Sequence, residues 1–216
     1  MSLFEGRDLL CIRGERRVFA GLSFAVPPGG ALLLTGPNGS GKSSLLRLMA
    51  GLLRPAAGAM TWAGSPVAED AEAHRARVRY VGHLNALKTV LTTAENVAFW
   101  ARLAGAGGAD VERALAGFSL TPLAHVAGRL LSSGQRRRVA LARLLAAPGD
   151  LWLLDEPSVG LDQASLAALS TAIAAHRAGG GRVVAATHTP IDMPGAETLD
   201  LGAFASPVPV LTEAGW

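Results

Sequence analysis

Apolar residues along the chain follow two patterns, one typical of strands and one typical of helices. Runs of mainly apolar residues predict strands at residues 9–13, 19–26, 31–35, 58–62, 78–81, 151–154 and 183–186. Apolar residues at helical spacing predict helices at residues 43–50, 133–147 and 163–176. Strands and helices alternate over most of the chain, so we predict an α/β fold with a largely parallel sheet.

The middle of the chain departs from this alternation. Between residues 92 and 118 the pattern is helical, and a glycine-rich break at residues 105–108 separates two helices. No strand pattern occurs between residues 84 and 140. We therefore expect a helical insertion within the α/β domain.

The composition limits the class of protein. With 216 residues, the chain has the length of one large α/β domain or two small ones. Half of the residues are hydrophobic, but no apolar run reaches the roughly 18–20 residues that a membrane helix needs. Glu5, Arg7 and Asp8 interrupt any signal peptide, and the single cysteine, Cys11, fits a reducing compartment, so we expect a cytosolic chain. The net charge of +3 is a weak indication of nucleic-acid binding and a modest one of contact with an anionic membrane.

A glycine-rich loop joins the predicted strand at residues 31–35 to the helix that follows it. Its glycines let successive backbone N–H groups face inward at a helix N-terminus, which favours phosphate. Lys42 should reach the β- and γ-phosphates of a nucleotide, and the Ser43 hydroxyl should bind Mg²⁺. The nucleotide-binding residues expected from this loop are Gly36, Pro37, Asn38, Gly39, Ser40, Gly41, Lys42, Ser43 and Ser44.

Two acidic residues follow the predicted strand at residues 151–154. Open α/β sheets bind ligands beyond the carboxyl ends of their strands, and Asp155 lies at that edge. Its carboxylate can hold Mg²⁺ directly or through water, and Glu156 can act as the general base for an attacking water. Taken alone, the pair could also be two solvated acids at a strand end.

The sequence Leu131-Ser132-Ser133-Gly134-Gln135 lies between these two motifs. The two serines are suitable caps for the next helix, and the glycine allows close approach of another backbone. The motif could be a plain helix cap, but it is also a second candidate phosphate site, which suggests a nucleotide site shared between two chains. Of the three arginines at residues 136–138, we expect two to lie on a solvated face.

Together the three motifs resemble those of the ATP-binding-cassette (ABC) ATPases. The resemblance implies a P-loop NTPase of the ABC type, with an N-terminal antiparallel β part and a helical subdomain, that hydrolyses ATP with Mg²⁺. It implies a single domain with its core at residues 1–83 and 148–216 and the helical subdomain at residues 84–147.

The resemblance also assigns roles between subunits. It implies an ATP-dependent homodimer in which the signature residues of one subunit close on the γ-phosphate held by the other; these residues are Ser132, Ser133, Gly134 and Gln135. His188, after the strand at residues 183–186, would contact the γ-phosphate and orient the water. Asp162 matches the D-loop, which couples the two subunits.

Two positions depart from the superfamily pattern. Where ABC subunits usually carry an aromatic residue that stacks on adenine, this chain has Arg13. A guanidinium plane can also stack on a base, so Arg13 is our candidate, with Phe19 as the alternative. Where a glutamine (the Q-loop) normally follows the strand at residues 78–81, the chain has His83. We expect His83 to take the place of the glutamine, beside Mg²⁺ and in contact with the membrane partner; the alternative is a surface histidine.

These departures are similar to the pattern of the CcmA family, the ATP-binding subunits of the cytochrome c maturation (haem exporter) system. The segments that carry the resemblance are Cys11-Ile12-Arg13-Gly14, Tyr80-Val81-Gly82-His83, Lys88 and Leu91-Thr92-Thr93-Ala94-Glu95-Asn96. The resemblance implies membrane subunits of the CcmB, CcmC and CcmD type, a peripheral place on the cytoplasmic face of the bacterial inner membrane, and release of a haem-loaded chaperone or export of haem.

Two alternatives stay open at this point. One is an ABC subunit that exports another substrate, such as a lipid or a drug. The other is a soluble ABC protein that acts on nucleic acid or ribosomes, which the short spacing between Lys42 and Asp155 disfavours. We therefore expect no nucleic-acid partner.

Overall fold

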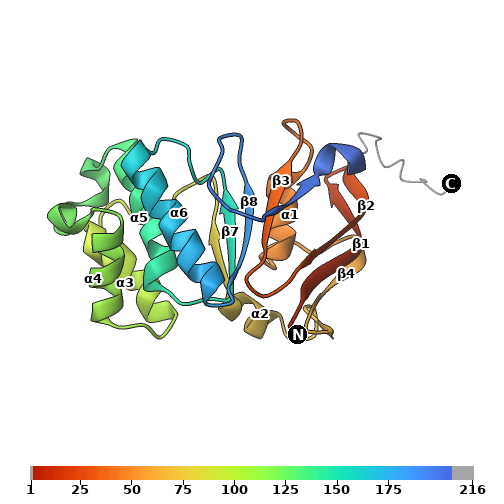
Figure 1. The fold of residues 1–216 in the computed structure, drawn as a ribbon, viewed down its shortest axis with the longest axis horizontal. Helices are drawn as coiled ribbons and strands as arrows, with labels where there is room; N and C mark the ends of the chain where they lie inside the picture. The colour runs from red at the N-terminus through yellow and green to blue at the C-terminus, as the bar shows by residue number, and fades with distance from the viewer. Residues whose placement is uncertain (1, 206–216) are drawn as a thin grey trace.

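The computed structural model describes residues 2–205 as two sheets and a set of helices (Figure 1). The larger sheet is parallel, with the strand order β6 (Val78–Val81), β7 (Leu151–Asp155), β8 (Arg182–Ala186), β3 (Ala31–Thr35) and β9 (Glu197–Asp200). The smaller sheet is antiparallel, with the order β2 (Arg16–Val26), β1 (Phe4–Arg13), β4 (Ala57–Trp62) and β5 (Ser65–Pro66). The predicted α/β class and the antiparallel N-terminal part are confirmed.

Helices cover both faces of the parallel sheet. Helix α1 (Lys42–Met49) lies between the two sheets, while α5 (Ser133–Ala146) and α6 (Gln163–Ala178) pack on the other face (Figure 1). Side chains of β7 alternate between these layers, since Leu151 and Leu153 join the core around α1 and Trp152 and Leu154 join the other. A strand buried on both faces has to be apolar throughout, which explains the continuous apolar runs in the sequence.

The helical part lies at the end of the molecule away from the antiparallel sheet (Figure 1). Helices α3 (Thr93–Leu103) and α4 (Gly108–Gly117) pack on each other and on α5. Helix α3 begins with a capping box, in which the Thr92 hydroxyl accepts from the Glu95 N–H and the Glu95 carboxylate accepts from the Thr92 N–H. The described part of the chain also contains three short 3₁₀ helices, which are η1 (Thr121–Leu123), η2 (Gly128–Leu130) and η3 (Leu201–Phe204). The limits at residues 84 and 147 stay a prediction.

Three elements were not predicted from the sequence. Helix α2 (Ala71–Arg77) has no apolar periodicity and buries only His74, and β5 has two exposed residues. Strand β9 pairs with β3 through its backbone while most of its side chains are exposed. The predicted strand at residues 9–13 begins earlier, at Phe4, because a bulge with Asp8 at φ +50° interrupts its alternation. No helix within residues 2–205 is long and apolar enough to cross a bilayer.

Candidate functional site

A cavity of about 600 Å³ lies where the parallel strands end. Much of the phosphate loop, residues 38–39 and 41–44, forms part of its wall. Beyond the loop, the predicted residues that line it are Arg13, His83, Asp155, Glu156 and His188. The fold therefore brings together residues from five separate parts of the sequence.

The phosphate loop has the tight curvature that its glycines allow. Gly41, at φ +104°, lies against the antiparallel sheet, and a Cβ there would be 2.6 Å from Val18 Cγ1 and 2.8 Å from Phe19 Cδ1. Both the backbone angle and the space therefore require glycine. The loop ends at α1, whose first residue is Lys42, so the N-terminus of a helix forms part of the cavity wall.

Two polar side chains of the loop fit a phosphate. Lys42 Nζ donates to the carbonyl oxygens of Gly36 at 2.7 Å and Pro37 at 3.1 Å, which holds the ammonium group across the loop. Ser40 Oγ is buried and has no hydrogen-bond partner among the described residues. Phosphate oxygens would supply acceptors to both groups.

Oxygen atoms suited to Mg²⁺ face each other at the edge of the loop. Ser43 Oγ donates to Asp155 Oδ1 at 3.1 Å, and the Tyr80 hydroxyl lies 3.5 Å from Asp155 Oδ2. Burial and the Asp155 carboxylate raise the pKa of Tyr80, so its hydroxyl stays a neutral donor. Residues 2–205 contain no group of three or more His, Cys, Asp or Glu that could hold a metal. Mg²⁺ that binds together with nucleotide phosphates usually needs only one or two protein carboxylates. Ser43 and Asp155 fit such an ion.

The candidate base lies beside the candidate histidine. Glu156 has φ +49°, a costly angle for a residue other than glycine, and its N–H donates to the Ala186 carbonyl at 2.8 Å. Its Oε2 accepts from the His188 N–H at 3.2 Å, and His188 Nε2 lies 3.6 Å from Glu156 Oε1 and 3.1 Å from Asn38 Oδ1. The carboxylate, the imidazole and the phosphate loop therefore surround one part of the cavity.

The two candidates for base stacking differ in position. Arg13 is the last residue of β1 and lines the cavity. Phe19 is fully buried in the core, where it packs beneath Gly41. The position of Arg13 in the cavity wall therefore favours it over Phe19, and its stacking on a base stays a prediction.

The signature residues form the start of α5. Ser132 Oγ accepts from the Gln135 N–H at 3.2 Å, and Gln135 Oε1 accepts from the Ser132 N–H at 2.8 Å, a complete capping box. A Cβ at Gly134 would lie 2.7 Å from the Gly160 carbonyl oxygen, so the signature packs on the loop that leads to Asp162. Asp162 in turn caps α6, because its Oδ1 accepts from the Ser165 N–H at 2.8 Å. None of the signature residues lines the cavity of its own chain.

His83 lies on the boundary between two hollows. It lines the nucleotide cavity and also a groove of about 530 Å³ on the side of α3 and α5. His83 therefore lies in the same cavity wall as Ser43 and Asp155 and also faces a second hollow. Its role in place of the glutamine stays a prediction.

Comparison with known proteins identifies the family. A family model described as ABC transporter matches residues 19–159. A Rhodospirillum rubrum protein, named cytochrome c biogenesis ATP-binding export protein CcmA, is 64% identical over 204 residues, which cover 94% of this chain and 88% of the relative. The chain belongs to the CcmA family of ABC transporter proteins.

Further comparisons bear on the family and on the fold. A CcmA protein from Paramagnetospirillum magneticum is 56% identical over 94% of this chain and 96% of its own length. A solved ATP-binding subunit of an ABC transporter is 29% identical, with a TM-score of 0.78 over 86% of this chain and 79% of that chain. An ABC transporter ATP-binding protein from Pyrococcus furiosus, at 21% identity, shares the fold with a TM-score of 0.81 over 94% of this chain and all of that one. The resemblance seen in the sequence is confirmed.

The sequence alone does not identify two residues of this candidate site. Tyr80 belongs to a segment that carries the family resemblance, but nothing in the sequence indicates that its hydroxyl lies beside Asp155. Arg137 was one of three arginines without a distinguishing signal, but it alone of the three is buried, at 4% exposure. No pattern in the sequence marks either contact, because both partners come from distant segments.

Proposed function

We propose that this chain is the ATP-hydrolysing subunit of an ABC complex for cytochrome c biogenesis. The observation that carries the proposal is that Lys42, Glu156 and His188 converge on one cavity in a member of the CcmA family. The reaction is hydrolysis of ATP to ADP and phosphate. We infer that its energy drives release of a haem-loaded chaperone or export of haem, as the CcmA resemblance implies.

Each side chain of the cavity has one task in this reaction. Lys42 binds the β- and γ-phosphates, and Ser43 and Asp155 hold Mg²⁺, which neutralises charge on the phosphates when bound. Glu156 accepts a proton from water as the water oxygen bonds to the γ-phosphorus, and the bond to the β–γ bridging oxygen breaks. His188, hydrogen-bonded to Asn38, orients the γ-phosphate and the water. Arg13 stacks on the base.

A second copy of the chain completes the site. The signature residues cap α5 and do not line their own cavity, so they are available to the γ-phosphate held by a partner subunit. Gly134 lies against the D-loop backbone at Gly160, which couples the signature to the loop before Asp162. Both observations support an ATP-dependent homodimer with two composite sites.

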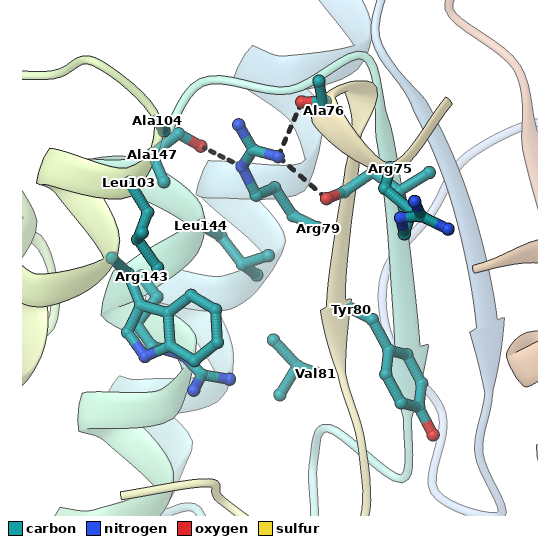
Figure 2. A pocket seen from close by; sticks show the side chains of 12 residues that line it. Arg75, Ala76, Arg79, Tyr80, Val81, Leu103, Ala104, Arg143, Leu144 and Ala147 are labelled. Carbon is teal, nitrogen blue, oxygen red and sulfur yellow. Dashed lines mark hydrogen bonds between the residues drawn. The ribbon is translucent and has the colours of Figure 1, made fainter. Parts of the chain in front are cut away.

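The groove beside His83 is suited to a membrane subunit. Its rim carries the exposed side chains of Leu52 and Leu84, and it continues into a hollow of about 350 Å³ between β6 and the helices α3 and α5. Figure 2 shows that hollow, where Arg79 donates to the carbonyl oxygens of Ala76 and Ala147.

The charge of the groove indicates what kind of segment would occupy it. Arg47, Arg75 and Arg143 line it, and Arg143 lies over the Trp100 ring at 4.6 Å. Arg143 is buried, whereas Arg47 and Arg75 are exposed, and two exposed guanidinium groups beside an apolar floor fit an acidic amphipathic helix. We infer that a membrane subunit of the CcmB or CcmC type supplies this helix, with CcmD in the same complex, and holds the chain at the cytoplasmic face of the inner membrane.

His83 would connect this contact to hydrolysis. Because it borders both the groove and the nucleotide cavity, a displacement of the segment by the membrane subunit would reach the magnesium residues. An imidazole retains a donor and an acceptor, as the glutamine usual at this place does.

Replacement of the CcmA gene in Rhodospirillum rubrum by variants of this chain tests the proposal, with c-type cytochromes measured by haem staining. The unchanged chain should restore the cytochromes and Lys42→Ala should not. His83→Ala should fail in cells while the purified protein still hydrolyses ATP, and His83→Gln should restore more than His83→Ala. The matched control is His125→Ala, an exposed histidine outside both hollows. Unchanged maturation with Lys42→Ala would contradict the role in cytochrome c biogenesis.

A further inference from the structure

Arg137 is a charged side chain buried between α5, β7 and the segment after β6. It is 4% exposed, and none of the ion pairs found within residues 2–205 includes it. Burial lowers the pKa of Arg137 from its ordinary value, and the nearby Asp155 and Glu156 carboxylates offset only part of this decrease. A guanidinium stays charged in proteins, so burying it is costly unless every N–H finds an acceptor.

All five N–H groups of this guanidinium have separate acceptors. Nη2 donates to the carbonyl oxygens of Asp155 at 2.8 Å and Glu156 at 2.7 Å, and Nε donates to that of Pro157 at 3.3 Å. Nη1 donates to the Gly82 carbonyl at 2.8 Å and to Asn85 Oδ1 at 3.1 Å. A guanidinium has five N–H donors in a rigid fork, so its whole capacity is used.

The acceptors on one side belong to the residues that hydrolyse ATP in the proposed function. Three consecutive carbonyls, from Asp155 to Pro157, accept from Arg137. The peptide groups of Glu156 are thereby held on both sides, since its N–H donates to Ala186 and its carbonyl accepts from Arg137. These bonds offset the cost of the positive φ and fix the direction of the Glu156 side chain.

The acceptors on the other side flank His83. Gly82 precedes it, and Asn85 follows two residues later. Both His83 and Glu156 line the nucleotide cavity. One guanidinium from the second turn of α5 therefore holds two walls of that cavity to the helix that begins with the signature.

We propose that Arg137 is a positioning residue for ATP hydrolysis, which fixes the Glu156 backbone and the His83 segment to the signature helix. The inference rests on the proposed hydrolytic role of Glu156. Any movement of α5 when a partner subunit or a membrane subunit docks is then passed to the general base. Arg137 does not line the cavity and contributes no atom to the reaction itself.

The neighbouring arginine provides a matched control. Arg138 lies on the same helix and donates to the carbonyl oxygens of Phe118 and Ser119, which belong to the helical part. Arg138→Gln removes the same charge and a similar kind of bond without touching the hydrolysis site. Arg137→Lys keeps the charge but supplies three donors in place of five, and Arg137→Gln supplies two.

ATPase kinetics and ATP affinity of the purified full chain test the inference, with a fluorescent ATP analogue and Mg²⁺ as the binding probe. Arg137→Gln should lower kcat on the order of a hundredfold, the scale of a base misplaced by about 1 Å. The dissociation constant for the probe should stay within about threefold, because the phosphate loop is untouched. Arg137→Lys should keep more of kcat than Arg137→Gln, and Arg138→Gln should keep both parameters.

The outcomes separate this inference from the proposed function, with Glu156→Gln measured beside the Arg137 variants. If Glu156→Gln abolishes turnover but both Arg137 variants keep the unchanged chain's kcat, Arg137 does not position the base. A parallel loss of kcat and probe binding in both variants would show a role in folding alone and overturn the inference too. If Arg137→Gln does not fold, as judged by circular dichroism, Arg137→Lys is compared with the unchanged chain instead. A lower kcat with an unchanged dissociation constant for the probe then supports the inference, and any other result overturns it. Turnover unaffected by Glu156→Gln would instead refute the proposed function.

Discussion

Replacement of Gly134 by alanine probes the contact between the signature and the D-loop. The new Cβ would lie 2.7 Å from the Gly160 carbonyl oxygen, whereas ordinary van der Waals contact begins at 3.4 Å. The two backbones would therefore have to separate by about 0.7 Å, the difference between these distances, if the contact were fully relieved. Overpacking of this kind costs about 1–3 kcal/mol, and the lower end is expected here because Gly160 is exposed and its loop can yield.

The expected effect on function is larger than the effect on stability. In the proposed dimer the signature completes the partner's site, so a displacement of this size should lower kcat by about tenfold to a hundredfold. ATP affinity should be unchanged, because no signature residue lines the cavity of its own chain. Steady-state ATPase assays, probe titration and thermal unfolding of Gly134→Ala give the three quantities.

A second glycine serves as the control for this measurement. Gly108, at the start of α4, has open space around the position of a Cβ, so Gly108→Ala should leave all three quantities unchanged. A Gly134→Ala protein with the kcat of the unchanged chain would refute the reasoning, since it would show that the close backbone approach is not required for hydrolysis.

Three further predictions concern the shared site, the phosphate loop and pH. Gly134→Asp and Lys42→Ala should each be inactive, but a mixture of the two should recover part of the activity, because one composite site then carries neither defect; an inactive mixture would argue against a site shared between subunits. Lys42→Ala alone should lose most of its affinity in a fluorescent-nucleotide titration, since the phosphate charge is left unpaired; unchanged affinity would mean that the loop does not bind the phosphates. Burial, with the ring stacked 4.0 Å from Trp152, lowers the pKa of His176 from 6.5 to about 4. The unfolded chain then binds a proton between pH 6.5 and 4 that the folded chain does not. The free energy of unfolding should therefore decrease as the pH is lowered from 6.5 to 4, and urea unfolding should show a smaller decrease for His176→Gln. An identical decrease would contradict the assignment.

The elements that the sequence predicted are those buried on both faces or apolar on one. Strands β3, β7 and β8 are continuous apolar runs because each lies between two helical layers. Strand β9 has no such signal because its pairing with β3 uses backbone groups, and α2 has none because its sequence is mostly polar and buries a single histidine. Hydrophobic periodicity reports burial of side chains, and both elements bury few.

The site could be predicted as far as its chemistry is local. Lys42, Asp155 and Glu156 stand in short motifs whose spacing already specifies a strand, a turn and a helix terminus. Arg137 could not be assigned, because four of its five acceptors are backbone carbonyls, which any residue type provides, from two segments far from it in the sequence. The choice between Arg13 and Phe19 also needed the fold, which buries the aromatic ring completely.

The central claim is that Glu156 is the general base for ATP hydrolysis and that this hydrolysis allows the ATP-bound dimer to dissociate. Turnover and size-exclusion chromatography of Glu156→Gln, with ATP and Mg²⁺, test it most directly. The amide keeps the shape of the side chain and loses the base, so kcat should fall on the order of a hundredfold or more while the protein elutes as a stable dimer that EDTA dissociates. Glu197→Gln, which changes an exposed carboxylate on β9, should behave as the unchanged chain does. A Glu156→Gln protein that hydrolyses ATP at the normal rate and stays monomeric would contradict the account.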